Sequence, residues 1–219
     1  NTRILVLVDG ATVNEAWGQF AGVGFDSIVS IDDIARIEVI RGPVGALYGA
    51  NAFFGIINIV TRGAAEASRA WGRVAINSIN GEVATAGFAA GGVHKQLRGS
   101  ILAMNRIGDT TSVPGIGTGL VGDGATTLIA SVVGSYGGSF VQARALRSRR
   151  DSPFAPYDSD PMLESPFSLF NTQLLVEGGH TRELSKRLTL SVRGYASFYR
   201  YSDRIRYAED DVDTPDIDE

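Results

Sequence analysis

The pattern of apolar and polar residues changes once along the chain, at a short stretch of small and polar residues, 63–68. Before that stretch, apolar residues come in short, separate runs. Asn1 to Val8 is mostly apolar, which predicts a buried strand, and Asp9-Gly10 after it is a turn signal. Residues 36–41 and 54–61 are rich in Ile and Val, which predicts two further strands.

The residues between these runs carry signals for turns and short helices. Gly42-Pro43 ends the 36–41 strand, because proline donates no backbone hydrogen bond. Val44 to Tyr48 has room for about one helical turn, which Gly49 closes. Ser30 is placed to cap a short helix over 31–35. These signals predict a small mixed α/β domain.

From residue 69 onward, strand-like runs alternate with turn signals. In the last run Leu190, Val192 and Phe198 share one face, whereas Arg193 and Tyr195 share the other. An apolar face opposite a polar one is typical of a transmembrane barrel, whose apolar side meets lipid. The runs should be antiparallel neighbours in sequence order, at 69–78, 83–93, 96–106, 126–136, 139–149, 168–182 and 187–201.

The connections between these runs also differ in length. Short turns at 94–95, 137–138 and 183–186 alternate with long connections at 107–125 and 148–167. Outer-membrane barrels have short periplasmic turns and long external loops. Seven strands do not close a large transporter barrel, which has about 22. A soluble antiparallel sandwich has the same alternation, so the pattern alone leaves both architectures open.

Composition narrows the classes of protein. The formal net charge of −4 gives no reason to expect a nucleic-acid partner. No apolar run approaches the roughly 20 residues of a membrane helix. The chain begins at Asn1 without a leader and ends in the acidic stretch 209–219, so we expect an internal fragment of a longer protein. Two interpretations of that stretch remain: a disordered loop, or a site that binds a cation through oxygen ligands.

No catalytic, cofactor-binding or metal site is predicted, and the chain is not expected to be an enzyme. The sequence has no Gly-x-Ser-x-Gly motif and no histidine beside a nucleophile. Residues 117–122 match G-x-G-x-x-G but lack the strand-to-helix context of a dinucleotide site, so we expect a flexible external loop. His94 and His180 lack the further ligands that zinc needs.

Four arginines lie where the fifth run meets a long connection: Arg144, Arg147, Arg149 and Arg150. Arginine suits carboxylate and phosphate groups, so the cluster is a candidate contact for an anionic ligand or for lipopolysaccharide phosphates. A solvated strand end is the alternative. Alternation places Arg144 towards the lumen of a barrel and Arg147 away from it.

The first 62 residues resemble the plug domain of TonB-dependent outer-membrane receptors. The resemblance runs through three stretches in the order and spacing of that family: LVLVDGATVN (5–14), IDDIARIEVIRGP (31–43) and RIEVIRGPVGALYGANAFFGIINIVTR (36–62). The plug signature residues are Arg36, Glu38, Arg41, Gly42, Pro43, Tyr48, Gly49 and Asn58.

This resemblance implies a partial plug domain, residues 1–62, and the N-terminal part of a transmembrane β-barrel, 69–219, with about seven of a presumed 22 strands. It implies active uptake across the bacterial outer membrane of a scarce ligand, such as a ferric siderophore or cobalamin. The implied partners are TonB, through a segment missing from this sequence, and the lipid and lipopolysaccharide of the outer membrane. The resemblance also implies that Arg41 helps to hold the plug by pairing with a barrel glutamate.

Two other functions remain as alternatives. One is a passive porin-like or adhesive outer-membrane barrel, although a porin has no need of a folded plug. The other is a soluble β-sandwich enzyme domain, against which the lack of a catalytic constellation counts. The sequence does not select the ligand.

Overall fold

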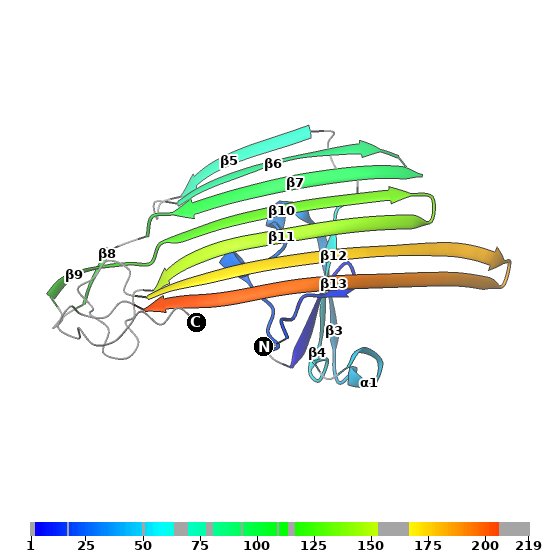
Figure 1. Cartoon of the computed structure of the whole chain (residues 1–219), viewed down its shortest axis with the longest axis horizontal. Coiled ribbons are helices and arrows are strands. Elements are labelled where there is room, and N and C mark those ends of the chain that lie inside the picture. Colours follow the sequence, from blue (N-terminus) through cyan, green and yellow to red (C-terminus); the bar gives the residue numbers. More distant parts are fainter. Residues whose placement is uncertain are drawn as a thin grey trace.

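The computed structural model describes residues 3–16, 18–49, 51–63, 70–77, 81–92, 94–108, 110–113, 117–152 and 167–205. Their strands form a four-stranded sheet, a seven-stranded sheet and a two-stranded sheet. Figure 1 shows the long strands of the seven-stranded sheet lying side by side, with strands of the smaller sheet running across them and emerging beneath.

The four-stranded sheet belongs to the plug region and has the order β2-β1-β4-β3. Its strands are β1 (Ile4–Val8), β2 (Ala11–Thr12), β3 (Ile34–Arg41) and β4 (Gly55–Thr61). β1 runs parallel to β4, while β2 and β3 are antiparallel to their neighbours. The three strands predicted from the Ile and Val runs are confirmed.

Three short helices accompany this sheet: η1 (Gly24–Asp26), η2 (Ile31–Asp33) and α1 (Gly45–Tyr48). α1 is the predicted single turn, and Gly49 follows it with a φ of 92°. Ser30 accepts a hydrogen bond from the Asp32 amide at 3.3 Å, as a cap should. The helix is shorter than the predicted 31–35, because β-branched Ile34 already pairs with β4 at Thr61.

The seven-stranded sheet has the order β13-β12-β11-β10-β7-β6-β5, and every neighbouring pair is antiparallel. Its strands are β5 (Ala70–Asn77), β6 (Gly81–Gly91), β7 (Lys95–Arg106), β10 (Ala125–Tyr136), β11 (Ser139–Ser152), β12 (Phe167–Ser185) and β13 (Leu188–Ile205). All seven predicted runs are strands, and the sheet remains open with β5 and β13 at its edges.

The side chains of β13 point to the two faces of the sheet that the sequence predicted for them. Leu190, Val192 and Phe198 are exposed on the face away from the plug. Arg193 donates a hydrogen bond to the plug at Asp9, and Tyr195 lines a hollow that it shares with β1 and α1. The period-two pattern therefore predicted correctly the face of the sheet on which each of these side chains lies.

The connection after β7 differs from the prediction. Residues 117–122 were expected to be a flexible loop, but they form β9 (Gly117–Gly122), which pairs with β8 (Thr110–Val113). β-Branched Thr110, Thr111 and Val113 favour this small hairpin. A strand in this position also lacks the following helix that a dinucleotide site requires.

The plug and the large sheet share one apolar core. Its buried residues come from the plug (Val8, Ala11, Ile28 and Val29) and from the sheet (Leu102, Ile129, Leu146 and Leu175). A second cluster, inside the plug, contains Leu5, Leu7, Ala52 and Ile56. The shared core fixes the plug against one face of the sheet.

β4 ends at Thr61 and β5 begins at Ala70, so the expected boundary between 1–62 and 69–219 falls mostly in 64–69, outside the described residues. The division into these two domains stays a prediction. Within the described ranges, no helix is long and apolar enough to cross a membrane.

Candidate functional site

Polar side chains gather on the face of the large sheet that meets the plug. Arg98, Gln142 and Arg144 project from this face, and all three are buried. A buried charge is costly unless it is paired and hydrogen-bonded. Arg98 pairs with Asp33 of the plug and Arg144 pairs with Asp9 of the plug, whereas Gln142 bonds to Glu177 of the sheet. A third plug carboxylate, Asp26, pairs with Arg150.

Asp33, in η2, makes the most enclosed of these contacts. Arg98 Nη2 donates to Oδ1 at 2.5 Å, and Ser100 Oγ donates to Oδ2 at 2.5 Å. Ser131 Oγ, from the next strand, lies 3.3 Å from Oδ2. The Asp33 and Arg98 side chains are only 2% and 6% exposed. The guanidinium of Arg98 also lies 4.7 Å from the ring centre of Trp71, a cation–π contact.

Asp9, in the turn between β1 and β2, joins the plug to β11. Its carboxylate accepts from the amide and the hydroxyl of Thr61, each at 2.8 Å, which ties the turn to the end of β4. Arg144 Nη2 donates to Asp9 Oδ2 at 2.8 Å and to Thr61 Oγ1 at 3.1 Å. One guanidinium, 1% exposed, therefore binds two plug elements together.

This contact continues along the sheet to β13. Arg144 donates to Gln142 at 3.1 Å, and Gln142 donates to buried Glu177 at 2.5 Å. Glu177 also accepts from Arg193 Nε at 2.9 Å. Arg193 returns to the plug, donating to the Asp9 carbonyl oxygen at 2.6 Å. Three adjacent strands therefore share one polar network with the β1–β2 turn.

Asp26, in η1, makes the third contact. It accepts from Ser148 Oγ at 2.6 Å and pairs with Arg150 at 2.7 Å. Thr127 Oγ1 donates to the neighbouring Phe25 carbonyl at 3.0 Å. Arg150 is 43% exposed, so this pair is screened by solvent and contributes less than the other two.

Apolar contacts and buried ion pairs contribute differently to the interface between plug and sheet. Apolar burial supplies adhesion, at about 1.5–3 kcal/mol for each fully buried Val or Ile side chain. Buried ion pairs add little net adhesion, because undocking rehydrates both partners. They set position instead, since a plug in another register leaves charges buried without partners.

Three plug signature residues form a hydrogen-bonded row. Arg36 Nε and Asn58 Nδ2 donate to the two oxygens of Glu38, at 2.8 and 2.9 Å. The Asn58 carbonyl oxygen accepts from the Gly10 amide at 3.2 Å. The bond from Asn58, and then that from Arg36, lowers the pKa of Glu38. The row connects β3 and β4 to the turn that carries Asp9.

The other signature residues shape the end of the plug that carries α1. Gly42 has a φ of 106°, a left-handed conformation that favours glycine, and its amide bonds to the Phe54 carbonyl at 3.0 Å. β3 ends at Arg41, directly before Gly42 and Pro43, as the sequence predicted. Tyr48 lines the same hollow as Tyr195.

Arg41 lies exposed at the end of β3, and no ion pair joins it to a carboxylate among the described residues. Its role in holding the plug stays a prediction. The described ion pairs between plug and sheet are reversed relative to the predicted one. In them the plug provides the carboxylate and the sheet provides the arginine.

The structure separates the four arginines that the sequence grouped together. Arg144 and Arg150 lie on the inner face and pair with Asp9 and Asp26 of the plug. Arg147 and Arg149 lie exposed on the outer face of the same strand. Contact with an outside anion therefore stays a prediction for Arg147 and Arg149, whereas the guanidinium of Arg144 is occupied by the plug.

Sequence reasoning missed Asp26, Asp33 and Arg98 as interface residues. Arg98 carried a usable signal, since it lies on the buried face of a strand and needs a partner. The aspartates carried none, because acidic residues in a first helical turn are ordinary.

Comparison with known proteins supports the plug assignment. Residues 1–56 match the family model of the TonB-dependent receptor plug domain. Over 61 residues, 28% of this chain, the sequence is 46% identical to the vitamin B12 transporter BtuB of Vibrio vulnificus. The match covers 9% of that transporter.

Solved structures match nearly the whole chain in fold. The siderophore receptor PiuA of Acinetobacter baumannii matches over 91% of this chain with a TM-score of 0.64 and 12% identity. The ferric-catecholate import receptor Fiu of E. coli matches over 94% (TM-score 0.60, 14% identity). The ferric enterobactin receptor PfeA of Pseudomonas aeruginosa matches over 93% (TM-score 0.58, 19% identity). The chain spans 29%, 33% and 34% of these three structures.

A plug domain docked on antiparallel barrel strands defines a class of protein, the plugged outer-membrane barrels. Residues 1–56 are identified as a TonB-dependent receptor plug, and the strands that follow have the fold of the barrel in such receptors, which lie in the bacterial outer membrane. The relatives are transporters and receptors rather than enzymes, which agrees with the prediction that this chain is no enzyme.

Proposed function

We propose that the receptor containing this sequence takes up a scarce metal chelate actively across the outer membrane, with energy delivered through TonB. The observation that carries this proposal is the plug held against the inner face of the barrel sheet by a shared apolar core and buried ion pairs. A docked plug obstructs the lumen, so the ligand passes only when the plug moves.

The size of the shared core supports a need for energy. Val8, Ile28 and Val29 are each at most 5% exposed. Burying three such side chains stabilises docking by about 5–9 kcal/mol, an upper range because part of this burial persists in any loosened state. At 5 kcal/mol, spontaneous undocking would occupy less than about one molecule in a thousand. A passive porin-like or adhesive barrel has no use for such a plug.

The names of the relatives support this ligand class. The relative of the plug segment is named a transporter of vitamin B12, and the structures of similar fold are named receptors for siderophores or ferric catecholates. Vitamin B12 and ferric catecholates are metal complexes, and a siderophore is a metal chelator. A ferric siderophore and cobalamin both remain candidates, and TonB would bind N-terminal to the residues described.

A binding and uptake panel tests this function. Cells that lack their own chelate receptors would express the receptor from its full reading frame and be offered labelled cobalamin and labelled ferric siderophores of the catecholate and hydroxamate types. We expect saturable surface binding of one chelate class. No saturable binding of any chelate, together with free entry of unrelated solutes of similar size, would establish the passive barrel instead.

A further inference from the structure

The described ion pairs between plug and sheet share one chemistry, because the plug supplies an aspartate to each and the sheet supplies an arginine. The pairs are Asp9 with Arg144, Asp26 with Arg150, Asp32 with Arg73, and Asp33 with Arg98. When the plug moves away, these carboxylates leave and the arginines face the lumen without them. The wall of the sheet therefore becomes more positive as the passage opens.

Two of these arginines belong to oxyanion sites that the sheet builds from a guanidinium and a hydroxyl. Ser100 Oγ and Arg98 Nη2 donate to the two oxygens of Asp33, each at 2.5 Å. Ser148 Oγ donates to Asp26 at 2.6 Å, and Arg150 pairs with the other oxygen of that carboxylate at 2.7 Å. In both sites the donors come from the sheet, so they stay in place when the aspartate leaves.

The wall arginines also have donors that the plug leaves unused. Arg98 Nη1, Arg144 Nε and Arg150 Nε are buried and have no hydrogen-bond partner among the described residues. The side chains of Arg98 and Arg144 are only 6% and 1% exposed. A buried donor without a partner is unfavourable. A group with more acceptor oxygens than one carboxylate would satisfy these donors better than the plug does.

Three of the arginines follow one another along the wall. Arg150 lies near the end of β11 that leads into a long connection, the predicted external side. Arg144 lies roughly 20 Å further along the same strand, at about 3.4 Å per residue. Arg98 comes next, because it pairs with Val133, and Val133 pairs with Gln142, the inward-facing residue that follows Arg144. The series therefore runs in the direction of uptake.

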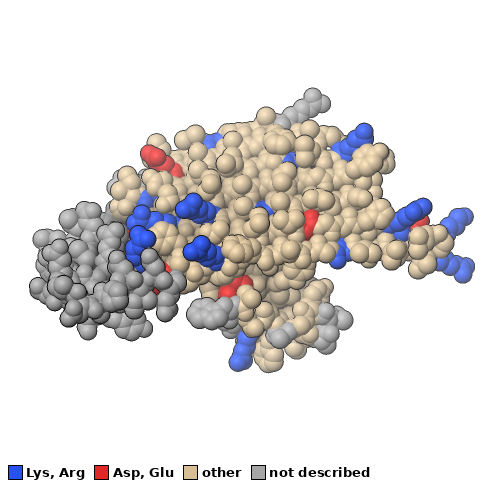
Figure 2. Space-filling view, in the orientation of Figure 1, with Lys and Arg blue, Asp and Glu red and all other residues tan. Residues whose placement is uncertain are grey.

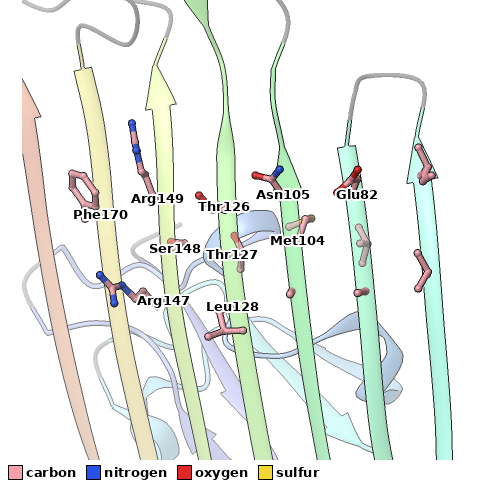
Figure 3. A pocket seen from close by; sticks show the side chains of 15 residues that line it. Glu82, Met104, Asn105, Thr126, Thr127, Leu128, Arg147, Ser148, Arg149 and Phe170 are labelled. Atoms are coloured by element: carbon pink, nitrogen blue, oxygen red, sulfur yellow. The ribbon is translucent and has the colours of Figure 1, made fainter.

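The arginines of the outer face take no part in this series. Figure 2 shows mostly uncharged residues over the middle of the visible face of the sheet, with Lys and Arg gathered towards its ends. Figure 3 shows Arg147 and Arg149 on β11, where they line a hollow of the outer face together with Phe170. On the lumen side, by contrast, Arg98 and Arg144 place positive charge in the middle of the sheet.

We propose that Arg98, Arg144 and Arg150 bind oxyanion groups of the transported chelate as it passes, in place of the plug aspartates, so that the receptor selects chelates of net negative charge. This inference rests on the proposed function. It favours ferric complexes of catecholates or carboxylates over ferric hydroxamates and cyanocobalamin, which have no net charge.

The exchange of one oxyanion for another also explains how such a ligand helps to move the plug. Arginine binds a planar oxyanion through charge-assisted, often bidentate hydrogen bonds, whether the oxygens belong to an aspartate or to a ligand. Removing a plug carboxylate without replacement leaves a guanidinium without its counter-charge, which is costly wherever water does not reach it. A ligand that binds only the uncovered wall stabilises the state in which the plug has moved.

The first test compares chelates of different charge. Cells that lack their own chelate receptors would express the receptor from its full reading frame. They would be offered labelled ferric complexes of a catecholate, a carboxylate and a hydroxamate, and labelled cyanocobalamin. We expect energy-dependent accumulation of an anionic complex only. Energy-dependent accumulation of a neutral chelate would overturn this inference and leave the proposed function standing, whereas accumulation of no chelate would refute the proposed function itself.

The second test removes charge from the wall and the plug together, so that the docked state contains no unpaired charge. One variant combines Asp33→Asn with Arg98→Met, and the other combines Asp9→Asn with Arg144→Gln. The matched control, Asp32→Asn with Arg73→Gln, also removes one plug–sheet pair, but Arg73 lies on edge strand β5, outside the series. Gel mobility of the unheated protein verifies folding, and entry of small antibiotics reports whether the plug stays docked.

We expect each wall variant to accumulate the anionic chelate about tenfold more slowly than the wild type, because each loses a hydrogen bond to a charged group. Surface binding in uncoupled cells should stay within about twofold of the wild type, since the plug covers these arginines before it moves. The control should accumulate the chelate at the wild-type rate. Unchanged accumulation by either folded variant would overturn the proposal. So would an equal loss in the control, or a loss that follows antibiotic entry, because the pairs would then act only through docking.

Discussion

Replacing Asp33 by Asn should loosen the docked plug far more than the same change at its neighbour Asp32. Both residues lie in η2, so any effect on that helix is shared. Asp33 pairs with Arg98 at 2.5 Å with both side chains almost fully buried. Asp32 pairs with Arg73 at 2.7 Å, but these side chains are 26% and 49% exposed. The two pairs therefore separate burial from charge.

The expected magnitudes differ by several kcal/mol. Asp33→Asn leaves the Arg98 guanidinium buried without a counter-charge, which costs about 3–5 kcal/mol in the docked state. Undocking rehydrates Arg98, so the change favours the undocked plug about a hundredfold or more. Asp32→Asn removes an exposed pair worth at most about 1 kcal/mol, or roughly fivefold.

Hydrogen exchange at Ile28 and Val29 in the purified receptor reports this equilibrium, because these plug residues are buried in the core shared with the large sheet and undocking exposes them to solvent. A second change, Arg98→Met, should recover much of the loss in Asp33→Asn, since it removes the unpaired charge while keeping an apolar side chain beside Trp71. Equal exchange in the Asp33 and Asp32 variants, or no recovery in the double variant, would refute the role of the buried pair.

Three further outcomes are expected of the receptor expressed from its full reading frame. Leu190→Arg places a charge on the lipid face, at a cost of about 2–4 kcal/mol near mid-bilayer, and should reduce the amount of heat-modifiable barrel; Ser191→Arg should not, and equal yields would contradict the orientation of β13. Arg41→Met should raise the entry of small antibiotics if Arg41 holds the plug, and unchanged permeability would refute that role. Glu38 contributes hydrogen bonds to the plug that are present above its ordinary pKa and lost as the pH falls through its lowered pKa; the β3–β4 amides should lose protection in acid, and Asn58→Ala should remove most of this pH dependence.

Local pattern was sufficient for the seven strands of the large sheet. Period-two alternation located β13 and assigned its lipid face, because side chains on successive residues must point to opposite faces. Gly42-Pro43 and Gly49 marked the turn around α1 for an equally local reason, the φ angles that these residues adopt.

The interface required information that no local pattern contains. Asp33 and Arg98 lie 65 residues apart, and Asp9 and Arg144 lie 135 apart. Alternation indicated that Arg144 faces inward, but its partner depends on how the plug is oriented against the sheet. Alternation also placed Arg144 and Arg147 correctly on opposite faces of one strand, but it gave no reason to expect that Arg150 would pair with Asp26 of the plug.

The small β8–β9 hairpin was missed for a different reason. Its glycines at 117, 119 and 122 are typical of loops, and the strand signal came from the partner segment 110–113. Pairing between two weak strands depends on the contact between them rather than on either segment alone.

The most direct test of active uptake is accumulation of the bound chelate before and after collapse of the proton gradient. Cells would express the receptor from its full reading frame, and surface binding would be measured separately from internal label. We expect surface binding to persist and accumulation to stop when an uncoupler is added, and likewise in cells without TonB. Continued entry of the chelate after uncoupling would contradict TonB-dependent uptake and establish a passive barrel in its place.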